Sequence, residues 1–128
     1  MPLLPAPLLA TVARMPGLRL LVLHGSRATG RAHARSDWDF AFLADPGFDA
    51  DGLQAQLVEC LGAEQIDMAD LGRAGALLRH RVASSGTLVH ERTPGAFQAF
   101  QVDAAQVWCD MAPVLEPAYE RVLGAFAR

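Results

Sequence analysis

The sequence contains no lysine: all 11 basic residues are arginine, and with 14 acidic residues the formal net charge is -3. A chain with this balance lacks the bulk positive charge that attracts nucleic acid, so we expect no direct nucleic-acid partner. Its two cysteines, Cys60 and Cys109, lie far apart and have no metal-binding spacing. No apolar run reaches the roughly 18 residues of a membrane span, and no basic start precedes the apolar N-terminus. We therefore expect a cytoplasmic protein with no membrane partner.

The sequence does have a globular composition, 52% hydrophobic and 20% charged over 128 residues, which predicts a single domain spanning residues 1–128. Short apolar runs bounded by glycine alternate with segments whose apolar residues recur at helical spacing. The expected strands span residues 18–25, 37–44, 64–71 and 87–92, and the expected helices span residues 8–15, 51–61, 74–84 and 95–111, with another beginning at Pro113. This order predicts a small α/β domain.

Two carboxylates mark the strand expected at residues 37–44. Asp37 and Asp39 fall on one face of this strand because side chains alternate with a period of two. Like charges so close repel unless a cation lies between them, and hard oxygen ligands suit Mg²⁺ or Mn²⁺. Asp67, on a separate apolar strand, supplies a third carboxylate if the two strands are neighbours. Asp70 competes for this role, but strand alternation turns it to the other face, so Asp67 is preferred.

A glycine–serine turn precedes the carboxylates in the chain. Gly25 and Ser26 end the strand at residues 18–25, and Ser26 can cap a helical turn that begins at Arg27. Free backbone N–H groups at such a turn can hold a phosphate, which needs a small residue for close approach. Arg27 either reaches that phosphate or starts a solvated helix. His24 is interpreted as a structural histidine on an apolar strand.

The spacing between the glycine–serine turn and the aspartates resembles a known sequence signature. An Asp-x-Asp pair alone is common at solvated strand ends, but here it follows Gly25-Ser26 after ten residues. This arrangement resembles the signature G-S-x(10)-D-x-D of the polymerase-beta-like nucleotidyltransferase superfamily. The stretch "GSRATGRAHARSDWDFAFL", with "QIDMADL", "LLRHRVASSGTLVHER" and the tail "FQVDAAQVWCDMAPVLEPAYERVL", is similar to the minimal nucleotidyltransferase (MNT) domains of the MntA antitoxin family. Phe40 stands where the family often has Leu, an apolar exchange of little consequence.

The resemblance implies a fold and an activity. The implied fold class is α/β (α+β), a mixed β-sheet with helices packed mainly on one side. The implied activity is Mg²⁺- and ATP-dependent transfer of AMP to a tyrosine of a partner HEPN ribonuclease toxin, with a hetero-oligomer between the two. By position, Gly25, Ser26 and Arg27 would bind the nucleotide. Asp37, Asp39 and Asp67 would form the catalytic and metal-binding set, with Asp67 as a base for the attacking hydroxyl.

Two other functions remain open at this point. A small-molecule nucleotidyltransferase, such as one that modifies an aminoglycoside, has the same signature, although such enzymes generally carry a further substrate-binding domain. A non-catalytic antitoxin that neutralises its partner by binding alone is the other alternative. The acidic set and the glycine–serine turn favour an enzyme over this binding module.

Overall fold

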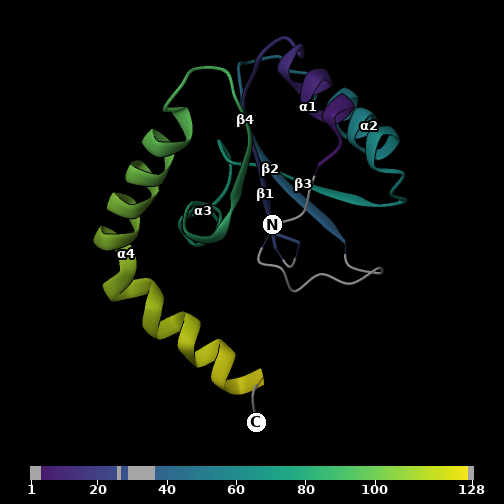
Figure 1. The fold of residues 1–128 in the computed structure, drawn as a ribbon. Helices are drawn as coiled ribbons and strands as arrows, with labels where there is room; N and C mark the ends of the chain where they lie inside the picture. Colours follow the sequence, from purple (N-terminus) through teal and green to yellow (C-terminus); the bar gives the residue numbers. More distant parts are fainter. Residues whose placement is uncertain (1–3, 26, 29–36, 127–128) are drawn as a thin grey trace.

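The structure, a computed structural model, describes residues 4–25, 27–28 and 37–126 (Figure 1). Within these residues the chain forms four helices and four strands. In order they are α1 (Ala6–Ala13), β1 (Leu18–His24), β2 (Trp38–Ala44), α2 (Ala50–Leu61), β3 (Ile66–Asp70), α3 (Ala76–Ser85), β4 (Thr87–Glu91) and α4 (Ala96–Phe126). Every strand lies where the apolar runs predict it, within one or two residues at each end. Residues 29–36, between β1 and β2, lie outside the described residues.

Local sequence explains where the helices begin and end. Asp49 accepts a hydrogen bond from the backbone N–H of Gly52 at 2.9 Å, which caps the start of α2. Gly62 follows the last residue of α2 with φ of 61°, the left-handed conformation that ends helices. At the start of α4, the carboxylate of Glu91 accepts hydrogen bonds from the backbone N–H groups of Gly95 and Phe97.

The four strands form one mixed sheet in the order β3-β2-β1-β4. β1 pairs antiparallel with both β2 and β4, whereas β2 and β3 are parallel. The parallel pair requires a crossover, and α2 supplies it between β2 and β3. Because β1 and β2 are antiparallel, the end of β1 lies beside the beginning of β2, which brings residues on either side of the connecting segment together.

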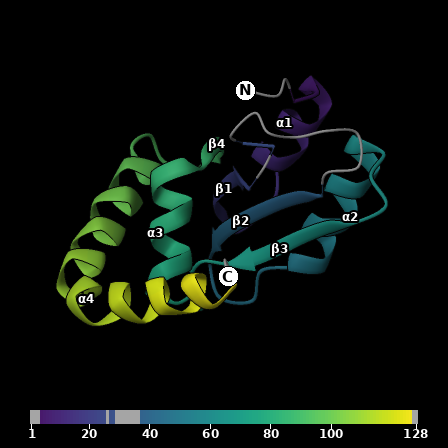
Figure 2. The ribbon, with the colours of Figure 1, turned by 90° about the horizontal axis from the view of Figure 1, so that it is seen from below.

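Helices cover both faces of the sheet. Figure 2 shows α1 and α2 on one side of the strands and α3 and α4 on the other. The core divides in the same way into two clusters, one containing Leu21, Leu23, Phe40 and Leu57 and the other containing Leu20, Val22, Ala41, Val82 and Phe100. The α/β fold class is confirmed, but the expectation that helices pack mainly on one side is wrong. Both faces of β1 and β2 are apolar, so each needs a helical layer to exclude water.

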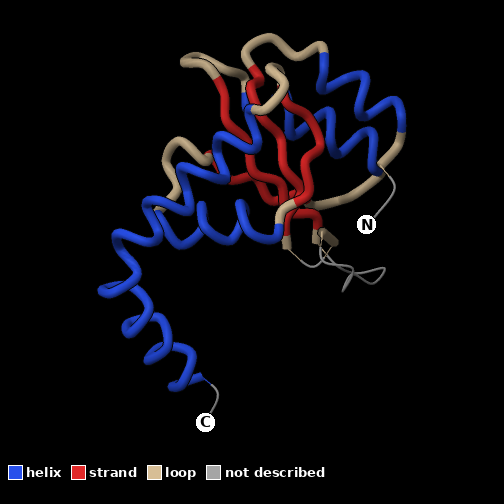
Figure 3. Tube along the Cα trace, turned by 60° about the vertical axis from the view of Figure 1, so that its left-hand side comes forward, coloured by secondary structure: helices blue, strands red, loops and turns tan. Residues whose placement is uncertain are grey.

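The C-terminal segment also differs from expectation. One helix, α4, runs from Ala96 to Phe126, where the sequence suggested a break before Pro113. Proline removes one backbone donor and crowds the preceding turn, which bends a helix without always ending it. Figures 1 and 3 show α4 changing direction along its length and its last part projecting beyond the rest of the molecule. In the described part of the chain, no helix combines the length and the apolar character needed to cross a membrane.

Candidate active site

Three polar side chains form a row across one end of the sheet. His24 ends β1 and is the register partner of Asp39 on β2. Asp39 in turn is the register partner of Asp67 on the parallel strand β3. Directly paired residues on neighbouring strands place their side chains on the same face, a few ångströms apart. The structure therefore brings together the two carboxylates that the sequence assigns to separate strands, and we call His24, Asp39 and Asp67 the acid row.

The acid row faces the layer formed by α3 and α4. Ala41 and Ala69, two residues beyond Asp39 and Asp67 on their strands, both pack in the core cluster beneath that layer. Met68, which lies between Asp67 and Ala69, packs on the opposite cluster with α1 and α2. Asp70 shares the alternation of Met68 and accepts a hydrogen bond from the N–H of Gly72 at 2.9 Å. The structure thus favours Asp67 over Asp70 as the partner of Asp39, as strand alternation predicts.

The electrostatics of the acid row centre on Asp39. Partial burial raises the pKa of Asp39 above its ordinary value, and the charge of Asp67 and a hydrogen bond shared with it raise that pKa further. The nearby charge of Asp37, an exposed residue just before β2, acts in the same direction. His24 opposes these effects. Ionised Asp39 is therefore held under repulsion, which an added cation would relieve.

His24, which the sequence suggests is a structural histidine, is the register partner of Asp39. Burial lowers the pKa of His24 more than the charges of Asp39 and Asp67 and a hydrogen bond to the Phe40 backbone raise it. The imidazole is consequently mostly neutral at pH 7, and its opposition to the raised pKa of Asp39 is strongest at lower pH, where it is protonated. In the sequence, His24 stands immediately before Gly25, at the end of the strand that precedes the two aspartates.

The turn after β1 adjoins the acid row directly. Gly25 has φ of 76°, and a Cβ atom on it would lie 2.5 Å from Oδ2 of Asp39. Any other residue there would meet both a strained backbone and the carboxylate, so glycine is required. The N–H of Ala28 donates to the carbonyl oxygen of Gly25 at 3.2 Å, which forms the expected turn. Ser26, the other predicted nucleotide-binding residue of this turn, lies outside the described residues.

Arg27 has a contact that the sequence did not predict. Its guanidinium lies over the ring of Trp38, 4.1 Å from the ring centroid. Trp38 is itself stacked on Phe40, with ring centroids 6.1 Å apart and planes within 9°. Arg27 is therefore attached to the first residue of β2, the strand that carries Asp39.

The carboxylate oxygens at this end of the sheet are chemically suited to bind a hard divalent cation. Asp39 and Asp67 are close enough to share a hydrogen bond, and Asp37 stands near enough for its charge to act on Asp39. Carboxylate oxygens of this kind are the ligands that Mg²⁺ and Mn²⁺ prefer. Over the described ranges, however, no three acidic, histidine or cysteine side chains converge tightly enough to form a ready-made metal site. Two carboxylates are in place, and the metal-binding role of the set stays a prediction.

Two surface hollows lie away from the acid row. One, of about 610 Å³, is lined by Arg19, Leu43, Arg79, Arg92, Phe100 and Asp103. Another, of about 600 Å³, is lined by Phe42, Asp45, Phe48, Met68 and Arg73. Both adjoin the end of the sheet where β2 and β3 finish, opposite the acid row, so neither marks the predicted site.

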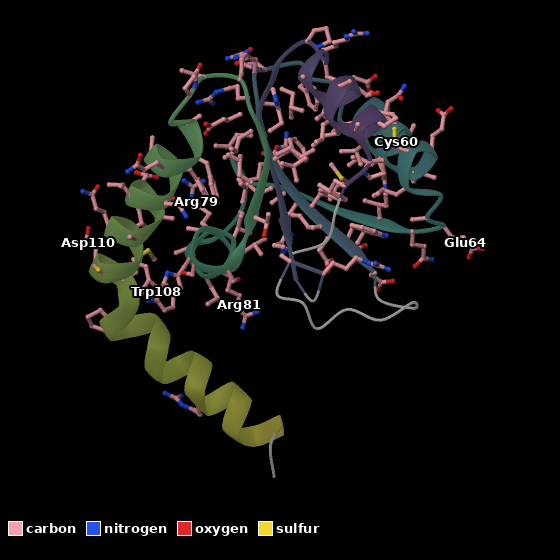
Figure 4. All side chains as sticks on the ribbon, in the orientation of Figure 1. Cys60, Glu64, Arg79, Arg81, Trp108 and Asp110 are labelled. Atoms are coloured by element: carbon pink, nitrogen blue, oxygen red, sulfur yellow. The ribbon has the colours of Figure 1, made fainter. Side chains whose placement is uncertain are left out.

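Helix α3, which covers the face of the acid row, is held firmly by α4. Arg79 points from α3 toward α4 (Figure 4) and donates to Asp103 at 2.9 Å. The rings of His80 and Trp108 are stacked across the same interface with centroids 4.4 Å apart. Arg81 points from the lower side of α3 in Figure 4. The helical layer over this face of the sheet is therefore fixed by polar and aromatic contacts as well as by the core.

Comparison with known proteins agrees with this geometry. Residues 8–94 match the family described as polymerase beta, nucleotidyltransferase. The chain is 33% identical over 106 residues to the protein adenylyltransferase MntA of Aphanizomenon flos-aquae (strain 2012/KM1/D3), covering 73% of this chain and 70% of that protein.

Solved structures share the fold. One chain of a toxin–antitoxin crystallised with AMP-PNP superposes with a TM-score of 0.73 at 24% identity, over 91% of this chain and 97% of that one. A tri-AMPylated Shewanella oneidensis HEPN toxin in complex with its MNT antitoxin contains a chain with a TM-score of 0.64 at 23% identity, over 91% of each. The family match spans more than half of the chain and includes every residue of the acid row. The chain therefore belongs to the polymerase beta nucleotidyltransferase family and is a relative of the MntA protein adenylyltransferases.

Proposed function

We propose that this protein is an antitoxin that transfers AMP from ATP to a tyrosine of a HEPN-type ribonuclease toxin and thereby neutralises it. The observation that carries the proposal is the direct register pairing of Asp39 with Asp67, next to the turn at Gly25. A nucleotidyltransferase needs carboxylates beside a turn that can bind phosphate, and the carboxylates next to the turn at Gly25 support this reaction class. The relation to MntA adenylyltransferases supports AMP as the transferred group and a protein as its acceptor.

Each residue of the site has a role in this proposal. Backbone N–H groups at Gly25 and Ser26 hold the terminal phosphates of ATP. Asp37, Asp39 and Asp67 hold Mg²⁺, or Mn²⁺ in its place. A bound divalent cation neutralises triphosphate charge and helps pyrophosphate leave. Asp39 is the central ligand because its carboxylate adjoins both the turn and Asp67.

The reaction needs a proton acceptor as well as a phosphate site. The tyrosine oxygen forms a bond to the α-phosphorus of ATP, and the bond from that phosphorus to the bridging oxygen breaks to release pyrophosphate. The tyrosine proton passes to the carboxylate of Asp67, which is exposed at the start of β3. Asp67 is suited to this role because it is accessible, whereas Asp39 is partly buried.

The proposal places the reaction in the cytoplasm and treats residues 1–128 as one minimal nucleotidyltransferase domain. It also expects a hetero-oligomer with the toxin and no direct contact with nucleic acid. The small-molecule and binding-only alternatives share the fold, so activity decides between them.

The test is a labelling experiment with the purified protein, Mg²⁺, ATP labelled at the α-phosphate, and the HEPN protein encoded beside it. We expect label on a tyrosine of the HEPN protein and loss of its ribonuclease activity, both abolished when EDTA is added. Neutralisation without label contradicts the proposal and supports binding alone. Label on an aminoglycoside, with none on the HEPN protein, contradicts it in favour of a small-molecule enzyme.

A further inference from the structure

The contact between Arg27 and Trp38 belongs to a stack of three side chains. The guanidinium of Arg27 lies 4.1 Å from the Trp38 ring centroid, and Trp38 lies parallel to Phe40 at 6.1 Å. Phe40 is fully buried in the cluster beneath α1 and α2. A cation over a tryptophan face is the strongest of the cation–π pairs in proteins. The stack therefore connects the turn after β1 to the hydrophobic core, because the Trp38 ring packs on buried Phe40.

This stack lies on the side of the sheet away from the acid row. Trp38 and Asp39 are consecutive on β2, so their side chains point to opposite faces. Ala28, the next residue of the turn, also packs on the cluster beneath α1 and α2. A guanidinium held on Trp38 is therefore directed away from the carboxylates that the proposed function assigns to the metal and the nucleotide.

The same stack fixes the turn relative to Asp39. Arg27 lies inside the turn closed by the hydrogen bond from Ala28 to Gly25. Gly25 in turn stands against Oδ2 of Asp39, with no space for a Cβ atom. Attachment of Arg27 to β2 therefore holds the turn at a set distance from the strand that carries Asp39.

We propose that Arg27 is a positioning residue: it aligns the phosphate-binding turn with Asp39 by stacking on Trp38, and its guanidinium does not bind the nucleotide. This inference rests on the proposed function, because it explains how the turn and the carboxylate keep the geometry that AMP transfer needs. It makes Trp38, a residue with no chemical role of its own, as important to nucleotide binding as Arg27.

A double-mutant cycle tests the inference. Arg27→Gln, Trp38→Leu and the double variant are compared with the wild type for the dissociation constant of AMP-PNP with Mg²⁺, and for the KM and kcat of AMP transfer. We expect each single variant to weaken AMP-PNP binding about fivefold to tenfold, with the double variant no weaker than either. Trp38→Phe should restore most of the affinity because a phenyl ring keeps a π face for the cation. Arg73→Gln is the matched control, since that arginine is almost fully exposed at the other end of β3 and should leave every constant unchanged.

Thermal unfolding of each variant separates positioning from loss of the fold. If Trp38→Leu acted only by destabilising the fold, its melting temperature would fall. Its loss of AMP-PNP affinity would then have no reason to equal the loss caused by Arg27→Gln. The inference is overturned if Arg27→Gln weakens AMP-PNP binding while Trp38→Leu does not, or if the two effects multiply in the double variant. If the wild type binds AMP-PNP but labels no protein, the proposed function fails and the cycle on affinity still decides the role of Arg27. If it binds no AMP-PNP, both fail.

Discussion

Asp39 and Asp67 are direct register partners in the parallel pair of β2 and β3, and their carboxyl groups share one face at one end of the sheet. The relationship is costly to the fold, because partial burial and the neighbouring carboxylates disfavour the ionised form of Asp39. Carboxyl groups whose ionised form is disfavoured in this way are concentrated at functional sites of proteins. The proposed function accounts for this cost, because a divalent cation bound between the carboxylates would relieve the repulsion.

The first prediction concerns stability at the acid row. Asp39→Asn should raise the melting temperature of the metal-free protein at pH 7 by a few degrees, since it removes a charge that the folded state disfavours. Asp39 has a folded pKa raised above its ordinary 3.8, so its favourable contribution is complete below that value and is lost as pH rises through the folded pKa. The advantage of the variant should therefore be largest at neutral pH and vanish below about pH 4.

Thermal unfolding in EDTA from pH 3 to 8 measures this difference. Asp70→Asn is the control, because Asp70 lies on β3 beside Asp67 in sequence but on the other face, and asparagine keeps the acceptor for Gly72. Its melting temperature should not show the same pH-dependent gain. A metal-free Asp39→Asn variant that is less stable than the wild type at pH 7 would contradict the account.

A second prediction concerns the glycine beside the carboxylate. Gly25→Ala and Gly47→Ala both place a side chain at positive φ, 76° and 81° respectively, at a cost of about 1–2 kcal/mol each. Gly47 has open space around the added atom, whereas the added atom at Gly25 meets Asp39. Gly25→Ala should therefore be the more destabilising variant, and it alone should reduce AMP transfer, by about tenfold or more. Equal melting temperatures together with equal transfer rates would show that Gly25 does not constrain Asp39.

A third prediction concerns the junction of β4 and α4. The carboxylate of Glu91 accepts hydrogen bonds from the N–H groups of Gly95 and Phe97 at 3.2 and 3.0 Å, and these bonds lower the pKa of Glu91. A lowered pKa contributes stability that is present above the unfolded value, ordinarily 4.5, and is lost as pH falls through the folded value. Glu91→Gln should thus be less stable than the wild type at pH 7, and the difference should shrink as the pH falls below 4.5.

Urea unfolding at a series of pH values checks this prediction. Glu64→Gln is the charge-matched control, because Glu64 projects from the surface near the start of β3 (Figure 4) and should show no such pH dependence. A stability difference for Glu91→Gln that grows on acidification would show that the helix start is held by something other than the ionised carboxylate.

Much of this structure could be predicted from the sequence because apolar runs and glycines mark the strands clearly. Strand alternation alone was enough to prefer Asp67 over Asp70. The pairing of Asp39 with Asp67 could not be derived in this way, since register between distant strands depends on the whole sheet. The same limit hid the pairing of His24 with Asp39.

Two further features depend on packing that no short motif reveals. The position of Arg27 after the glycine–serine turn suggests a phosphate ligand. Its guanidinium nevertheless lies over the ring of Trp38. Only the placement of Trp38 at the first position of β2 brings the two together. The second layer of helices was also missed, because the apolar character of both faces of β1 is visible in the sequence but the path of α3 and α4 is not.

AMP transfer by the Asp67→Asn variant measures whether the acid row takes part in the reaction. Asparagine keeps the size of the side chain and removes the charge and the proton acceptor, so the variant should fold but transfer AMP to the HEPN protein about 100-fold or more slowly than the wild type in Mg²⁺. Transfer at the wild-type rate would show that the carboxylate beside Asp39 takes no part in the reaction, and the assignment of this end of the sheet as the active site would be wrong.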